Sequence, residues 1–292
     1  MTAHGVSDED LRRRYAQVFD DVAEEYDRER RGYPDELIDA ACAYGELGPG
    51  DRVVEVGAGT GLLTASLVAR GLTVDAIDPG ANMIRLAERR VGEDAAVHFH
   101  RGKFEEVTLP RRAFAAVFSA TAFHWIEPSV GWARAADLLA PGGMLGLLQH
   151  CDVSDASTVD GWRALNAALV KVAPGIGKRW PELRDAETIL NGAEARSDNI
   201  SDVWSWIGRH ELAVPEAARL FKDVQIEVVP IYTEQTADQL NAYMRTTSLY
   251  RRLEPDQRPA LEEENLRVAE RLGGVVRTSE LAVLVTGRRS LP

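Results

Sequence analysis

Residues 53–61 read Val-Val-Glu-Val-Gly-Ala-Gly-Thr-Gly, an apolar run that ends in three glycines at alternate positions. The apolar run predicts a buried strand. The glycines allow a sharp turn into a helix and a close approach of backbone to a ligand, where a Cβ would clash. Asp78 follows the next apolar run, Thr73–Ile77, and lies 21 residues after Gly57. A carboxylate at that strand end can accept hydrogen bonds from both hydroxyls of a ribose.

Two classes of cofactor compete for a turn of this kind. Nicotinamide and flavin sites use G-x-G-x-x-G, which would need a third glycine at position 62, where this chain has Leu62. Glu55, two residues before the first glycine, would repel a pyrophosphate, whereas it suits a zwitterionic amino acid. These two departures favour S-adenosylmethionine. A tight turn without any ligand is the remaining alternative.

Outward from this turn, strands and helices alternate. We expect further strands at Val97–His100, Ala115–Ser119 and Met144–Gln149, with helices between them. This alternation predicts a parallel sheet with helices on both faces, wound by right-handed crossovers.

The pattern changes after residue 152. Helices are predicted at Trp162–Val172 and Ser201–Glu211, and strands return at Val224–Tyr232 and Leu281–Thr286, separated by helices at Thr236–Leu253 and Pro259–Leu272. The predicted fold is therefore a doubly wound α/β sheet of seven mostly parallel strands. We expect four segments: an N-terminal helical cover (1–35), the cofactor-binding half of the core (36–152), a helical insertion or lid (153–223) and the rest of the core (224–292).

The expected N-terminal cover has apolar residues at the spacing of one helix face, at Leu11, Tyr15, Val18, Phe19, Val22 and Tyr26. The arginines that follow, at 28, 30 and 31, are interpreted as part of a solvated helix face. The insertion contains four of the six tryptophans, at positions 162, 180, 204 and 206. One or two of them are expected to face a substrate.

Composition narrows the possible partners. The 292 residues include 34 Lys and Arg against 46 Asp and Glu, a net charge of −12, which argues against a nucleic acid backbone as ligand. The two cysteines cannot make a disulfide framework or a four-cysteine zinc site, and the scattered histidines predict no metal. Without an apolar run of about 20 residues, no membrane span is expected, and a cytoplasmic protein is predicted.

At this point a family resemblance is apparent. Residues 53–61, together with Ala76-Ile77-Asp78-Pro79, resemble motifs I and II of class I S-adenosylmethionine-dependent methyltransferases. The chain is similar in particular to the small-molecule group that includes trans-aconitate methyltransferase-like proteins. Further similar segments are Phe19–Asp27, Gly32–Pro34, Gly102–Glu105, Ser119–Trp125, Arg245–Leu253 and Gly273-Gly274.

The resemblance implies a cofactor site for S-adenosyl-L-methionine, with S-adenosyl-L-homocysteine as the product. Asp78 would hold the ribose, and the glycines, with Glu55 nearby, would face the methionine part. Pro79, Met83 and Phe104 would surround the adenine. The full set of expected cofactor residues is Glu55, Gly57, Ala58, Gly59, Thr60, Gly61, Asp78, Pro79, Met83, Lys103, Phe104 and Ala120.

His124 is the candidate general base, because it stands at the end of the fourth strand and a histidine titrates near neutral pH. A structural role for it is the alternative. The expected substrate-binding residues are Tyr26, Tyr33, His124, Trp125, Tyr243 and Arg245.

We expect methyl transfer to O or N of a small molecule by in-line displacement, with secondary metabolism as the setting. The alternatives are a catalytically silent cofactor-binding or interaction protein, a nucleic acid or protein methyltransferase, and a nicotinamide oxidoreductase. A monomer or a homodimer is expected.

Overall fold

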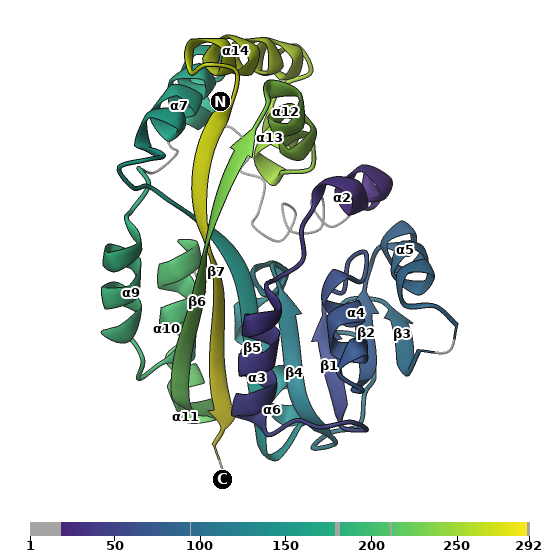
Figure 1. Ribbon diagram of the computed structural model, residues 1–292. Helices are drawn as coiled ribbons and strands as arrows, with labels where there is room; N and C mark the ends of the chain where they lie inside the picture. Colours follow the sequence, from purple (N-terminus) through teal and green to yellow (C-terminus); the bar gives the residue numbers. More distant parts are fainter. Residues whose placement is uncertain (1–18, 94, 179–181, 211, 291–292) are drawn as a thin grey trace, which may run out of the picture.

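The computed structural model describes residues 19–93, 95–178, 182–210 and 212–290. In this part of the chain one sheet has the strand order β3-β2-β1-β4-β5-β7-β6 (Figure 1). β7 pairs antiparallel with β5 and β6, and the pairs among β1 to β5 are parallel. The predicted doubly wound, mostly parallel seven-stranded sheet is confirmed. The strands are β1 (Arg52–Val56), β2 (Thr73–Asp78), β3 (Val97–Arg101), β4 (Phe114–Ala120), β5 (Leu139–Val153), β6 (Phe221–Gln235) and β7 (Val276–Arg289).

Helices cover both faces of the sheet. Side chains of α3 (Asp35–Gly45) and α4 (Leu62–Ala69) share one buried apolar cluster with residues of β1 and β2. Side chains of α6 (Pro128–Leu138) and α10 (Ile200–Gly208) form a second cluster on the other face. α5 (Ala81–Val91) packs beside α4 and β3. Within the described ranges, no helix is long and apolar enough to cross a membrane, and no three His, Cys, Asp or Glu side chains gather as a metal site.

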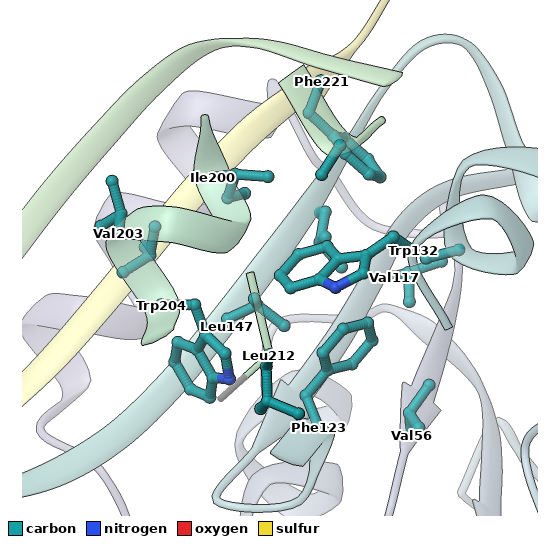
Figure 2. Packing of buried hydrophobic residues seen from close by; sticks show 14 of the residues in the cluster. Val56, Val117, Phe123, Trp132, Leu147, Ile200, Val203, Trp204, Leu212 and Phe221 are labelled. Carbon is teal, nitrogen blue, oxygen red and sulfur yellow. The ribbon is translucent and has the colours of Figure 1, made fainter. Parts of the chain in front are cut away.

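Large aromatic side chains fill the second cluster. Trp132 of α6 meets Phe123 edge to face, with ring centroids 4.8 Å apart, and both lie beside Leu147 of β5 (Figure 2). Trp204 of α10 is fully buried in the same cluster. This packing attaches the helices that follow β5 to the face of the sheet.

Three strands extend beyond the others at the carboxyl edge. Leu148 of β5 lies level with Ala120, the end of β4, and β5 continues five residues further to Val153. Over this extension β5 pairs with β7, which pairs in turn with β6. The strands predicted from apolar runs here were too short, because their polar ends are held by the antiparallel ladder rather than by a hydrophobic interior.

Helices stand above this extension (Figure 1). α7 (Val159–Val172), α12 (Ala237–Arg245), α13 (Ser248–Arg252) and α14 (Gln257–Arg271) share a third apolar cluster. The single helix predicted for 236–253 is divided into α12 and α13. The hydroxyl of Thr247 accepts a hydrogen bond from the N–H of Tyr250 and caps the second helix, as threonine commonly does. The other helices between β5 and β6 are α8 (Pro174–Gly177), α9 (Ala186–Glu194) and α11 (Ala217–Leu220).

The N-terminal helix joins two parts of the molecule. α2 (Ala23–Glu29) contacts both α5 and α12, and Phe19, Ala23 and Tyr26 pack on Met83. Three residues of the predicted apolar stripe, Leu11, Tyr15 and Val18, lie outside the described residues.

Candidate functional site

The glycine turn after β1 has two kinds of glycine. Gly57, Gly59 and Gly61 all have positive φ, at 72°, 55° and 82°. A Cβ on Gly57 would lie 2.2 Å from the Cβ of Ala122, and one on Gly61 would lie 2.9 Å from Ala87. A Cβ on Gly59 would meet no atom within 4 Å. Packing thus requires glycine at two positions, whereas at Gly59 the backbone borders open space that a ligand can fill.

Asp78 lies beside this turn at the end of β2. Its carboxylate accepts hydrogen bonds from the N–H of Gly59 at 2.9 Å and from the N–H of Gly80 at 2.7 Å. Burial raises the pKa of Asp78 to about 6, the two N–H groups oppose that rise, and Asp20 adds to it. The predicted ribose-binding carboxylate therefore adjoins the one glycine of the turn that faces open space.

Asp20 is a neighbour that the sequence interpretation missed. Its Oδ1 accepts hydrogen bonds from the N–H groups of Asn82 at 2.8 Å and Met83 at 3.2 Å, in the first turn of α5. Acidic groups are favoured at helix N-termini, where N–H groups lack partners. The only signal for it in the sequence is its place in the family-like segment 19–27.

Glu55 lies inside the protein beneath the turn. It is 1% exposed and accepts a hydrogen bond of 2.6 Å from the hydroxyl of Thr64 on α4. Burial raises its pKa to about 8, so the group is mostly uncharged at pH 7. Glu55 thus links β1 to α4 through a buried hydrogen bond. The nearby Thr60 hydroxyl is buried and has no hydrogen-bond partner in the described part of the chain.

The residues predicted around an adenine are less open. Phe104 is 2% exposed within the core, with the Arg134 guanidinium 5.2 Å from its ring centroid. Its ring therefore has no free face for an adenine, contrary to the expectation. Met83 is covered by α2. Lys103 reaches toward Glu106 at 3.8 Å, and Pro79 is exposed.

The other predicted contacts of the turn are backbone positions. Ala58 is buried in the apolar cluster under α4, and Ala120 is the last residue of β4. Both lie at the carboxyl edge where Gly57 ends the first strand.

A cavity of about 700 Å³ lies at the other end of the same edge. Its floor is the extension of β5, β7 and β6, and its walls are the end of α2 and helices α7, α12 and α14. One wall is apolar, with Leu165, Leu169, Leu240, Met244, Leu249 and Leu261. The polar part of the lining includes Arg30, His150, Asp152, Tyr243 and Glu280. This size and mixed lining are typical of small-molecule sites.

Two carboxylates belong to the polar part of the cavity lining. Asp152 of β5 and Glu280 of β7 are directly opposite in the antiparallel register, and His150 Nδ1 lies 3.3 Å from Glu280 Oε1. Asp152 exposes surface toward the cavity but is surrounded by protein. Burial and the neighbouring Glu280 raise its pKa to about 7, against the opposing effects of His150 and Arg30. No pattern in the sequence predicts this pair, because the two residues are 128 positions apart.

Arg30 corrects the interpretation of a solvated arginine cluster. Its guanidinium donates hydrogen bonds to Thr246 Oγ1 and to the Thr246 carbonyl, both at 3.0 Å, and to the Tyr243 hydroxyl at 3.2 Å. It also lies 5.1 Å from the Tyr26 ring centroid. Arg30 therefore turns inward and ties the N-terminal segment to α12, whereas Arg28 is exposed beside Glu29.

The predicted substrate residues on α12 are separated by the helix. Tyr243 lines the cavity. Arg245 does not, and binds both carboxylate oxygens of Glu262 at 2.8 and 2.6 Å. Since a helix turns about 100° per residue, two positions apart face nearly opposite directions. The expectation that Arg245 holds substrate is not supported by this placement.

Tyr33 stands between the two ends of the edge. Its ring stacks on His150 at 4.5 Å between centroids, and its hydroxyl is hydrogen-bonded to Thr121 Oγ1. Thr121 is followed by Ala122, which packs against Gly57. Of the predicted aromatic residues, Tyr33 is thus the one that connects the glycine turn to the cavity.

His124 and Trp125 lie on the short 3₁₀ helix Phe123–Trp125, and neither lines the cavity. His124 stacks on His210 at 4.6 Å, and its Nδ1 is buried without a hydrogen-bond partner among the described residues. Burial and His210 lower the pKa of His124 to about 3. Trp125 meets the ring of Phe19 at 6.0 Å. His210 was not singled out from the sequence.

The tryptophans of the insertion have different environments. Trp162 lines the cavity, as expected of one or two of them. Trp204 is in the core, and Trp206 lies between the guanidinium groups of Arg184 and Arg196. Trp180 lies outside the described residues.

Comparison with known proteins gives matches centred on the glycine turn. Residues 53–143 match the family model of a methyltransferase domain. An uncharacterized methyltransferase of Mycobacterium tuberculosis (strain ATCC 25618 / H37Rv) is 36% identical over 137 residues, which are 47% of this chain and 54% of that protein. The malonyl-[acyl-carrier protein] O-methyltransferase of Serratia marcescens is 32% identical over 134 residues, 43% of this chain and 51% of that protein. The chain thus spans about half the length of these curated relatives.

Solved structures share the architecture over most of the chain. A candidate type II methyltransferase from Anaeromyxobacter dehalogenans has a TM-score of 0.56 at 19% identity, covering 89% of this chain and 97% of that one. The [4+2]-cyclase SpnF has a TM-score of 0.52 at 15% identity, covering 99% and 98%. At these identities the likeness concerns the fold alone. Residues 53–143 thus form a methyltransferase domain, and the chain as a whole shares the fold of these solved structures.

Proposed function

We propose that the chain transfers the methyl group of S-adenosyl-L-methionine to an O or N atom of a small molecule bound in the 700 Å³ cavity. The observation that carries this proposal is the placement of Gly59 and Asp78 on the same sheet edge as the cavity. The methyltransferase domain match includes this turn. Its other support is Tyr33, which contacts His150 in the cavity and Thr121 just after β4.

The turn has features that fit the cofactor. The open space at Gly59 leaves room for a ligand against the backbone, and the buried Thr60 hydroxyl lacks a partner in the described part of the chain. Asp78 can accept hydrogen bonds from two ribose hydroxyls. The cofactor supplies an electrophilic methyl group on a sulfonium.

The protein contributes alignment and the exclusion of water. In-line displacement gains most from holding the reacting atoms in position, which can lower a barrier by about 7–11 kcal/mol in the best cases. α2 bridges α5 beside the turn and α12 beside the cavity, and Arg30 fixes it to α12. The N-terminal segment thus serves as a cover over both reactants.

The role of His124 as general base remains a prediction. With a pKa of about 3, its imidazole is neutral at pH 7 and a weak base. Its place outside the cavity wall also favours the structural alternative. Turnover of His124→Ala measured from pH 6 to 9 decides: an unchanged profile removes His124 from the mechanism.

A small acceptor is preferred to a nucleic acid because the chain carries a net charge of −12. The names of similar proteins do not settle the acceptor. One is a malonyl-[acyl-carrier protein] O-methyltransferase, and a protein of similar fold is a phosphoethanolamine N-methyltransferase from Haemonchus contortus, with a TM-score of 0.50. The setting in secondary metabolism and the monomeric or dimeric state remain predictions.

Calorimetry tests the cofactor. S-adenosylmethionine should bind the wild type, and Asp78→Ala should weaken binding by about 100-fold, since two hydrogen bonds to a charged group are lost. Asp39→Asn changes an exposed carboxylate that pairs with Arg70 and should leave the affinity unchanged. Tighter binding of NADH than of S-adenosylmethionine would contradict the proposal.

Transfer itself needs a second experiment. The protein is incubated with isotopically labelled S-adenosylmethionine and an extract of its producing organism, and mass spectrometry identifies what gains a methyl group. A labelled small molecule that appears only with active protein is expected. Tight binding of S-adenosylhomocysteine with no methyl transfer to any component would favour the silent cofactor-binding alternative.

A further inference from the structure

The cavity holds a pair of like charges whose position is costly. Asp152 and Glu280 are opposite each other across the β5–β7 ladder, so their side chains lie on the same face of the sheet. Like charges in this arrangement destabilise the pairing. The carboxylates line the cavity together with apolar side chains, so a ligand bound there can offset this cost.

Among the described residues, the pair forms no salt bridge with an arginine or a lysine. Within the residues that the structure describes, no Lys or Arg nitrogen lies within 4.0 Å of either carboxylate. Arg30 lies close enough to lower the pKa of Asp152, but it donates hydrogen bonds to Tyr243 and Thr246 instead. Both ring nitrogens of His150 are buried and make no hydrogen bond in the described part of the chain. The pair therefore has free hydrogen-bond acceptors that face the cavity.

The net charge of the side chains around the pair indicates the charge of the ligand. Arg30, Asp152 and Glu280 line this part of the cavity, so the acidic side chains outnumber the basic one by one. A ligand with one positive charge offsets this excess. A monoanionic ligand would instead add a like charge beside the two carboxylates, which is unfavourable.

We propose that the methyl acceptor is a small molecule with a protonated amine, bound with its ammonium group against Asp152 and Glu280. Its apolar body lies against Trp162, Leu165 and Met244, which are partly exposed and line the same cavity. The inference rests on the proposed function, because it names the acceptor class for the same cavity.

Matched probes test the charge preference without catalysis. Phenyl, indolyl and naphthyl groups, each with a two-carbon chain ending in an ammonium, a hydroxyl or a carboxylate, are titrated calorimetrically into the full chain saturated with S-adenosylhomocysteine. The ammonium probe of the best-fitting ring should bind about tenfold more tightly than its hydroxyl counterpart, and the carboxylate probe most weakly.

Three variants locate the preference. Asp152→Asn and Glu280→Gln should each reduce the preference for ammonium over hydroxyl to about twofold or less. Glu234→Gln is the matched control, because Glu234 also lines the cavity but pairs with Arg277 at 2.6 Å, and it should keep the full preference. Circular dichroism and S-adenosylhomocysteine affinity confirm folding. If one variant of the pair does not fold, the other carries the test.

Three results would overturn the proposal. They are tighter binding of carboxylate probes, no binding of any ammonium probe at millimolar concentration, and a full preference retained in the folded pair variants. Failure of the proposed function is separate, since it would show as absent cofactor binding or absent methyl transfer whatever the probes do.

Discussion

The two ends of the carboxyl edge of the sheet are built by different means. At β1 and β2, a nine-residue segment and one carboxylate form the candidate cofactor site, and backbone groups make most of it. At β5, β6 and β7, side chains from six or more elements surround the cavity. A site made of backbone depends on local conformation, whereas a site made of distant side chains depends on packing and on register. The two should therefore respond differently to substitution.

The largest expected difference lies within the turn itself. Gly57→Ala should cost about 2–5 kcal/mol of unfolding free energy, from left-handed strain and from the contact with Ala122. Gly59→Ala should cost only about 1–2 kcal/mol, from the strain alone. Yet Gly59→Ala should abolish measurable S-adenosylhomocysteine binding, because its methyl group would fill the ligand's space.

Urea denaturation and calorimetry measure both quantities. Equal losses of stability in the two variants, or normal cofactor binding by Gly59→Ala, would show that the glycines do not divide into packing and ligand-facing positions.

The next largest effect on stability is expected at Arg30, which links the N-terminal segment to α12 beside the cavity. Arg30→Ala removes three hydrogen bonds of a buried guanidinium and should lower the unfolding free energy by about 2–3 kcal/mol. Hydrogen exchange in α2 should become faster. Arg245→Ala is the control, as it breaks a partly exposed pair with Glu262 and should cost about 1 kcal/mol or less without affecting α2. Unchanged exchange in Arg30→Ala would mean that α2 is held by its contacts with α5 alone.

A smaller effect is expected from pH at the cofactor end. Asp78 has a pKa of about 6, so it is ionised above that pH and can accept two ribose hydroxyls, and it becomes protonated below. Affinity for S-adenosylhomocysteine should therefore fall by about tenfold from pH 7.5 to pH 5. Asp78→Asn should bind weakly with no such slope in calorimetry. The same slope in that variant would assign the titration to another group.

The smallest effect concerns Asp152 at the cavity end. Its pKa is raised from the model-peptide value of 3.8 to about 7, so the folded state binds the proton more tightly than the unfolded state. Stability is therefore lost as pH rises from about 4 to 7. Asp152→Asn removes this loss and should raise Tm relative to wild type at pH 8, on the order of 2 °C after allowing for screening by cavity water. The variant should show no gain at pH 4, and a gain that is equal at both pH values would point to packing instead.

The cofactor end could be predicted from the sequence because its chemistry is local. The glycines and Asp78 lie within two strand ends, and the spacing of Gly57, Gly59 and Gly61 decided the cofactor class. The doubly wound, mostly parallel sheet also followed from the alternation of strands and helices, whereas its strand order is known from the structure. Even here the sequence could not show which glycines are required by packing and which one borders open space, because Ala122 and Ala87 reach the turn from other elements.

The cavity end could not be predicted, because its side chains come from residues far apart in the sequence. Asp152 and Glu280 meet only through the register of β5 and β7, which apolar periodicity does not specify at polar strand ends. Arg30 was misassigned because a short charged helix has no apolar period to show which side is buried. Tyr243 and Arg245 were predicted together, although helical phase sends only the first toward the cavity.

The extension of β5 and β7 past their neighbours places side chains at regular intervals along the floor of the cavity. Along a strand, side chains on one face recur every second residue, or about 6.8 Å apart. On β7 that face carries Ala282 opposite His150, then Glu280 opposite Asp152, then Thr278. Moving the carboxylate from position 280 to 278 would shift the group that anchors the acceptor by about 6.8 Å along the strand. The shift is away from the methyl donor. Acceptors of different length could thus be accommodated by exchanging two residues on one strand, while the glycine turn remains untouched.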